Sequence, residues 1–308
     1  MANSVLSAPQ FQDENAAFEY VEAHLWPRGP VCPHCQNTDG TKIGRLNGKT
    51  TRPGLRKCYV CRKPFTVRIG SIFEDSHLAL HLWLQVIHLM CASKKGISTR
   101  QIQRMLQCSM KTAWHLTHRI RLAMADGGEA GPLGGMGKHV EADETYYGNK
   151  PHRKVRRGTG HKRVIVSLVE RGSDVRSFYV ETADIPTVRR IIDQHVDKAS
   201  TLNTDEAAMY KPLGREFVGH QVVHHGREEF VRDTAYTNTL EGFFSIFKRG
   251  MTGVYQRCDE KHLHRYLAEF DFRYNARQSL GVTDQQRTSR AVMGTKGKRL
   301  TYVAASGA

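Results

Sequence analysis

Three acidic residues of this sequence could act together on one reacting group. Asp143 lies near the end of a predicted strand in KHVEADETYY, Asp205 follows another predicted strand in TLNTDEAAMY, and Glu241 opens a predicted helix in TNTLEGFFSIFKRG. Two carboxylates at strand ends and a third from a helix can converge on two divalent cations. Such a pair clamps the attacking and leaving oxygens of an in-line phosphoryl displacement. Oxygen ligands of this kind suit Mg²⁺ or Mn²⁺. Glu144 would point to the opposite side of its strand and is not favoured.

Each acid also has an ordinary structural interpretation. Asp143 and Asp205 could be strand-end or turn residues, and Glu241 could complete a capping box begun by Asn238. Singly, these interpretations are at least as good as the catalytic one, but the joint spacing favours catalysis. Asn238 shares a helix face with Glu241 and could ligate a metal or position a water. Lys248 returns to that face seven residues after Glu241 and could hold a DNA phosphate.

Four cysteines suit a different metal. Cys32 and Cys35 in VCPHC and Cys58 and Cys61 in KCYVC form two Cys-x-x-Cys pairs with 22 residues between them. Two such knuckles can place four thiolates around one Zn²⁺, and the intervening segment is the right size for a small hairpin ribbon. Two unrelated reduced pairs are the alternative, but the double spacing is specific. His34 is expected to face solvent rather than the metal.

The elements that must position these residues change along the chain. The pattern predicts a multidomain α+β protein with strands over 138–148, 162–172 and 174–182 in its C-terminal α/β domain. A helix at about 186–198, a short strand into 201–205 and two helices from Asn238 complete that domain. The expected divisions are a helix and zinc ribbon (1–70), a helical module (71–125), a Gly-rich linker (126–137), the α/β domain (138–280) and a basic tail (281–308).

The charge balance points to a polyanionic partner. The chain carries 46 basic and 30 acidic residues, a net charge of +16, and nucleic acid is the usual partner for such an excess. The alternative is a solvated basic surface without a specific partner. We expect no membrane association and a cytoplasmic location, because no run of about 18 apolar residues and no secretory signal is evident. Seven cysteines, an odd number, argue against a disulfide scaffold.

Residues 96–124 have a helix-turn-helix rhythm. Ser98 can cap the first helix, residues 107–109 form the turn, and the second helix offers basic and polar side chains to a DNA groove. A plain helical hairpin that packs on its neighbour is the alternative. The residues expected to face outwards are Lys111, His115, His118, Arg119 and Arg121, of which Lys111, His115 and Arg119 are the predicted DNA contacts.

A basic loop, KPHRKVRRGTGHKR at 150–163, contains seven lysines or arginines and no acid. It would join the first two strands of the α/β domain beside Asp143 and could follow a DNA backbone. The alternative is a solvated, disordered loop. The predicted DNA contacts in it are Lys150, Arg153, Lys154, Arg156 and Arg157.

Together these motifs resemble bacterial insertion-sequence transposases, in particular the zinc-ribbon-bearing DDE transposases of the ISXO-like group. The resemblance rests on CPHC…CYVC, TAWHLTHRIR, VEADETYYGNK, LNTDEAAMY, NTLEGFFSIFKRG and HLHRYLAEFDFRYNAR, which span most of residues 11–277. It implies a ribonuclease H-like last domain and carries Asp143 and Asp205 over as catalytic aspartates. Members differ at the third position, with Asn, His or Glu, so Asn238 competes with Glu241. Phe244 stands where the family more often has Trp, a change that should preserve packing.

The resemblance implies DNA transposition. Water would attack the phosphodiester at an element end, and the freed 3′ hydroxyl would attack target DNA. The expected partners are transposon ends and target DNA, and a homo-oligomer is expected on the DNA. A non-catalytic DNA-binding regulator and a stand-alone nuclease are the alternatives. The intact set of three acids favours an enzyme over a regulator.

Overall fold

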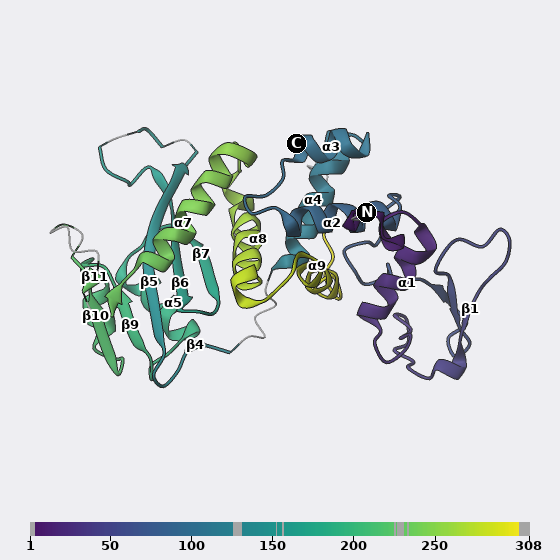
Figure 1. Ribbon diagram of the computed structural model, residues 1–308, viewed down its shortest axis with the longest axis horizontal. Coiled ribbons are helices and arrows are strands. Elements are labelled where there is room, and N and C mark those ends of the chain that lie inside the picture. The colour runs from purple at the N-terminus through teal and green to yellow at the C-terminus, as the bar shows by residue number, and fades with distance from the viewer. Residues whose placement is uncertain are drawn as a thin grey trace, which may run out of the picture. The chain divides into compact units, whose positions relative to one another are not determined.

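The protein divides into two compact units in a computed structural model. The first comprises residues 1–125 and 283–308, and the second residues 126–282 (Figure 1). The structure describes residues 4–125, 131–151, 153–155, 157–224, 226, 231–232 and 234–301. Within these residues, every helix is too short or too polar to cross a membrane.

The first unit contains a small three-stranded ribbon. Its strands β1 (Ile43–Arg45), β2 (Arg56–Cys58) and β3 (Pro64–Phe65) are antiparallel in that order. Ile43 and Phe65 are buried beside two of the cysteines, and Trp26 packs edge-on against Phe65. An ion pair of 2.7 Å between Arg56 and Glu22 ties the ribbon to α1 (Glu14–Leu25). Because this core is small, a bound metal would supply much of its stability.

Helices make up the rest of the first unit. Ser98 caps α3 and Gln107 ends it in the left-handed conformation, as expected for the turn at 107–109. The expected basic tail is wrong for its first part, because α9 forms there. A capping box between Thr283 and Gln286 starts this helix, and Ala291 and Val292 are buried on it. The helices are α2 (Leu80–Ala92), α3 (Thr99–Leu106), α4 (Met110–Met124) and α9 (Asp284–Met293), with 3₁₀ turns at Val5–Ser7, Pro9–Phe11 and Gly40–Lys42.

A five-stranded mixed sheet organises the second unit. Its order is β10-β9-β5-β6-β7; β5, β6 and β7 are antiparallel neighbours, whereas β9 and β10 run parallel to β5. The strands are β5 (His139–Asn149), β6 (Lys162–Glu170), β7 (Val175–Val180), β9 (Thr201–Thr204) and β10 (Gly219–Val222). Two smaller pairs join β4 (Leu133–Gly134) to β8 (Val196–Asp197) and β11 (Val231–Arg232) to β12 (Ala235–Tyr236).

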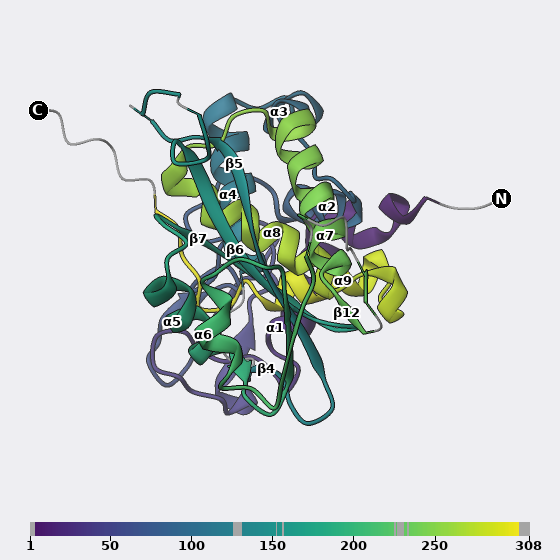
Figure 2. The same cartoon turned by 90° about the vertical axis from the view of Figure 1, so that its left-hand side faces the viewer.

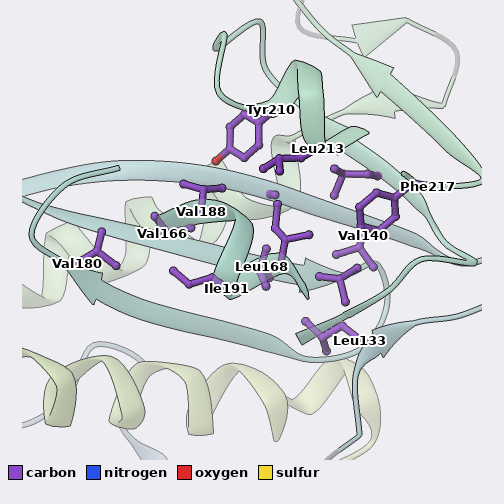
Figure 3. Close-up of a cluster of buried hydrophobic side chains, with 14 of the residues drawn as sticks. Leu133, Val140, Val166, Leu168, Val180, Val188, Ile191, Tyr210, Leu213 and Phe217 are labelled. Atoms are coloured by element: carbon purple, nitrogen blue, oxygen red, sulfur yellow. The ribbon is translucent and has the colours of Figure 1, made fainter. Parts of the chain in front are cut away.

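One face of this sheet is covered by α5 (Ile185–His195) and α6 (Tyr210–Gly214). The strands present alternate residues to it, such as Val140 on β5 and Val166 and Leu168 on β6. These pack against Val188 and Ile191 of α5 and Leu213 of α6, and the Tyr210 ring lies at the edge of the cluster (Figure 3).

The other face carries α7 (Asn238–Gly250) and α8 (Leu263–Asn275), which run beside the long strands (Figure 2). Ile165 and Val169 of β6 pack here against Phe243 and Phe247 of α7 and Phe270 of α8. Phe244 is also buried in this cluster. A π-helical turn, Met251–Tyr255, follows α7, and 3₁₀ turns cover Glu260–His262 and Gln278–Leu280.

Candidate active site and zinc centre

The sheet brings two of the predicted acids to neighbouring strands. Asp143 lies in the middle of β5, and Asp205 directly follows β9. These strands are parallel, with Glu141 opposite Asn203, so continuing the register by two residues leads to Asp143 and Asp205. Alternation along β5 turns Asp143 towards the face that α7 covers.

The charge environment of Asp143 includes the other two predicted acids. Burial raises the pKa of Asp143 to about 8, and the carboxylates of Glu144, Asp205 and Glu241 add to this effect. Like charges disfavour ionisation at short range, so residues from β5, the end of β9 and the start of α7 influence one site.

Glu144 also contributes to this acidic group, although it is not one of the three predicted catalytic acids. Its carboxylate accepts a hydrogen bond of 3.0 Å from the hydroxyl of the buried Tyr210. Burial and the charge of Asp205 raise the pKa of Glu144 to about 7. Alternation along β5 turns Glu144 away from Asp143 and towards Tyr210, as predicted, so only its adjacency to Asp143 in the sequence could have marked it.

The start of α7 differs from the capping-box alternative. Thr237 is the N-cap and its side chain makes no capping hydrogen bond, whereas Asn238 is already the first helical residue. The capping-box interpretation of Glu241 is therefore wrong. Asn238, Glu241 and Lys248 are all exposed, and their spacing places them along one side of the helix.

The acidic residues fit a divalent cation by their chemistry. They supply hard oxygen donors, and burial together with the repulsion of neighbouring carboxylates raises the pKa of Asp143 and of Glu144, so their charged forms are costly without a compensating positive charge. Among the described residues, only the cysteines place three or more ligand atoms within 4.8 Å of one another. The carboxylates that the structure describes are therefore spaced more widely than the ligands of one closed site.

The cysteines form a compact tetrad. The Sγ atoms of Cys32 and Cys61 lie 3.6 Å apart and those of Cys35 and Cys58 lie 3.7 Å apart. Tetrahedral zinc with Zn–S bonds of about 2.3 Å requires sulfur separations of about 3.8 Å, so the tetrad fits Zn²⁺. Backbone N–H groups of Cys61 and Val60 help lower the pKa of Cys58 to about 7, which favours the ligating thiolate.

Comparison with known proteins identifies the family. Residues 132–275 match the family described as the ISXO2-like transposase domain, and residues 12–64 match the transposase zinc-ribbon domain. The chain belongs to the ISXO2-like insertion-sequence transposases. A Halobacterium salinarum protein, described as an uncharacterized protein in transposable element ISH50, is 25% identical over 281 residues, covering 85% of this chain and 91% of the relative.

The helical hairpin of this transposase presents different residues from those expected. His118, Arg119 and Arg121 were expected to face outwards, but all three are buried. Arg119 Nε donates to the Leu300 carbonyl at 3.1 Å, and its guanidinium lies 6.0 Å from the Trp83 ring centroid. The expectation failed because the second half of α4 is packed all round.

The basic surface of the hairpin lies instead around its turn. Lys111 is exposed at the start of α4, and His115 is half-buried one turn later. Arg100 and Arg104 are exposed on α3, although neither is among the predicted DNA contacts. Their spacing of four residues on an amphipathic helix was the signal that could have found them.

In the basic loop of the transposase, one lysine is hydrogen-bonded at the end of β7 and several other described cations are exposed. Lys150 Nζ donates to the Glu181 carbonyl at 2.6 Å, so this residue fastens the loop to the end of β7. Arg153, Lys154 and Arg157 are exposed. Arg156, which was also predicted to contact DNA, lies outside the described residues.

Proposed function

We propose that this transposase uses Asp143, Asp205 and Glu241 for metal-dependent cleavage at transposon ends, and then transfers the freed 3′ hydroxyl to target DNA. The observation that carries the proposal is the environment of Asp143. Acids from the end of β9 and the start of α7 act electrostatically on this one strand residue. Perturbed carboxylates gathered from separate elements are characteristic of functional sites.

We infer a ribonuclease H-like fold for the catalytic domain. Its support is the strand order β7-β6-β5-β9-β10, in which three antiparallel strands are followed by two strands parallel to the first. In this arrangement β5 and β9 are adjacent, and their acids lie at one site.

The three carboxylates would hold two divalent cations, which when bound polarise the phosphate and lower the pKa of the attacking water or hydroxyl. Asp143 and Asp205 would fix the site on the rigid sheet. Glu241, from α7, would close it from the helix side. Lys248, exposed two turns further along α7, would bind a DNA phosphate next to the reacting one.

DNA would reach the site through the exposed cations. Arg153, Lys154 and Arg157 extend from the loop that follows the Asp143 strand and would follow the phosphate backbone. In the first unit, α3 and α4 would act as a helix-turn-helix module. Lys111 would contact DNA, whereas Arg119 is buried and bonded to the Leu300 carbonyl.

The test is cleavage of a labelled duplex that carries an element end, with Mg²⁺, beside a gel-shift on the same duplex. Asp143→Asn and Asp205→Asn should each abolish cleavage but retain DNA binding. Asp193→Asn is the matched control, because Asp193 is an exposed acid on α5 paired with Lys198. Normal cleavage by either active-site variant would refute the mechanism.

A second labelled duplex, offered as target, separates transposition from simple hydrolysis. Joined products that depend on a free 3′ hydroxyl at the element end are expected. Cleavage without joining would assign the site to a nuclease instead.

A further inference from the structure

A buried ion pair lies between the strand of Asp143 and the helix of Glu241. Glu141 is fully buried on β5, two residues before Asp143 and on the same side of the strand. Its Oε1 accepts hydrogen bonds from Arg171 Nε at 2.7 Å and from Thr239 Oγ1 at 2.8 Å. The pair therefore links the sheet directly to the first turn of α7.

Glu141 also completes the start of α7. The N-cap Thr237 provides no side-chain hydrogen bond, yet the Leu240 N–H, third in the helix, needs a partner. Glu141 Oε2 accepts from this N–H at 3.1 Å. A carboxylate at a helix N-terminus also interacts favourably with the helix dipole. The cap of α7 is thus supplied by β5, and Glu241 is the next residue after the capped amide.

Arg171 holds the segment that leads into α7. It lies in the turn after β6, and its backbone N–H donates to the His139 carbonyl at 3.0 Å. Its guanidinium donates to the carbonyls of Thr234 and Tyr236 at 2.7 Å each. It also stacks over the Tyr236 ring, 3.4 Å from the centroid. One side chain therefore fixes Glu141 and the path of the backbone before the helix.

We propose that Glu141 and Arg171 are positioning residues that set the separation of Asp143 and Glu241, an inference that rests on the proposed function. Burying Phe243 and Phe247 already holds α7 against the sheet, but apolar packing is non-directional. Stability alone also gives little reason for a buried ion pair, since apolar residues of similar volume often serve as well. Directed hydrogen bonds instead fix how far the helix slides and turns.

The main test compares Glu141→Gln with Asp271→Asn in the full-length protein. Asp271 is a matched control: it is a buried carboxyl of the same domain that joins α8 to β7 through the N–H and hydroxyl of Ser177, each at 2.8 Å. Glu141→Gln should raise the Mg²⁺ concentration for half-maximal cleavage about 10- to 100-fold, as loss of groups that orient metal ligands does. Asp271→Asn should leave it within about twofold.

Two measurements do not depend on turnover. Mn²⁺ titration followed by electron paramagnetic resonance, without DNA, should show the same loss of affinity for Glu141→Gln. Hydrogen exchange should speed up at the start of α7 in that variant but not in the control. Gel-shift affinity for DNA should be unchanged in both, because neither side chain is exposed to DNA.

Thr239→Val keeps the inference testable if Glu141→Gln does not fold. It removes one of the three hydrogen bonds to Glu141 and should produce a smaller shift in the same direction. The positioning role would be overturned if every folded variant had the same Mg²⁺ requirement and Mn²⁺ affinity as the control. Failure of the proposed function has a separate signature, because the unaltered protein would then show no cleavage that depends on Asp143.

Discussion

Replacing Glu241 with glutamine should abolish cleavage while leaving the fold almost untouched. The side chain is exposed in the first turn of α7, and it takes no part in a capping box because Thr237 is the N-cap. The amide before it, that of Leu240, is capped by Glu141. The charge of Glu241 near the helix N-terminus contributes about 0.3–1 kcal/mol to stability.

That small loss is partly offset, because removing the charge of Glu241 relieves its repulsion with Asp143. A net change below about 1 kcal/mol corresponds to a Tm shift of about 4 °C or less in a domain of this size. Cleavage should fall far more, by about 10²- to 10³-fold, the usual loss when one preorganised electrostatic partner of a transition state is removed.

The matched variant is Asn238→Ala, which changes the same side of α7 one turn earlier. Single-turnover cleavage, gel-shift and thermal unfolding should be measured for both proteins. If Asn238 is the third ligand, Asn238→Ala will be inactive and Glu241→Gln active. If both variants cleave at the normal rate, α7 supplies no ligand, and the proposal that a helix residue joins Asp143 and Asp205 in holding the metals is refuted.

Three further predictions concern the zinc centre, the basic loop and a buried acid. Cys58→Ser should reduce zinc content well below about one per chain and destabilise the ribbon, whereas unchanged zinc would disprove the assignment. Changing Arg153, Lys154 and Arg157 to Gln should weaken binding to all duplexes alike and reduce the slope of log affinity against log salt by up to about 3; loss confined to element ends would instead indicate base contacts. Burial raises the pKa of Asp271 from 3.8 to about 7, so the folded state holds a proton that the unfolded state releases, and stability should fall as pH rises from about 4 to 7. Asp271→Asn should abolish that fall and be more stable at pH 8 by on the order of 2–4 kcal/mol in urea unfolding, and parallel pH profiles would contradict this.

Local patterns predicted most of the secondary structure of the catalytic domain. KRVIVSLVE became β6 because its β-branched residues suit a strand that is buried on both faces. The pairing of β5 with β9 is different in kind, because the two strands are about 60 residues apart and no local pattern encodes their register. Helix α9 was missed because it has few apolar residues and therefore little helical periodicity. Those few residues are buried by packing within the first unit.

The acids themselves could be selected from the sequence, but their supporting residues could not. Asp143 lies in a predicted strand and Asp205 directly follows another, and that setting singles them out. Glu141 stands two residues before Asp143 with no local pattern that singles it out, and its role depends on partners 30 and 99 residues away. His118 and Arg119 show the opposite error, because helical periodicity cannot reveal that both sides of α4 are covered.

The contacts at the two ends of α7 explain how one helix can carry both a carboxylate and a phosphate-binding cation. Glu141 caps the first turn from β5, and the Tyr255 hydroxyl, in the π-helical turn after the helix, donates to the buried Glu269 of α8. Turning a helix by one residue rotates its face by about 100°, which would carry Glu241 and Lys248 away from the sheet acids together. Aromatic packing between the ends holds α7 against the sheet, but it fixes small rotations of the helix less closely than directed hydrogen bonds do. The polar contacts at both ends restrain rotation, so a transposase that depends on carboxylates from both sheet and helix should tolerate changes in the aromatic layer better than changes in these two buried acids.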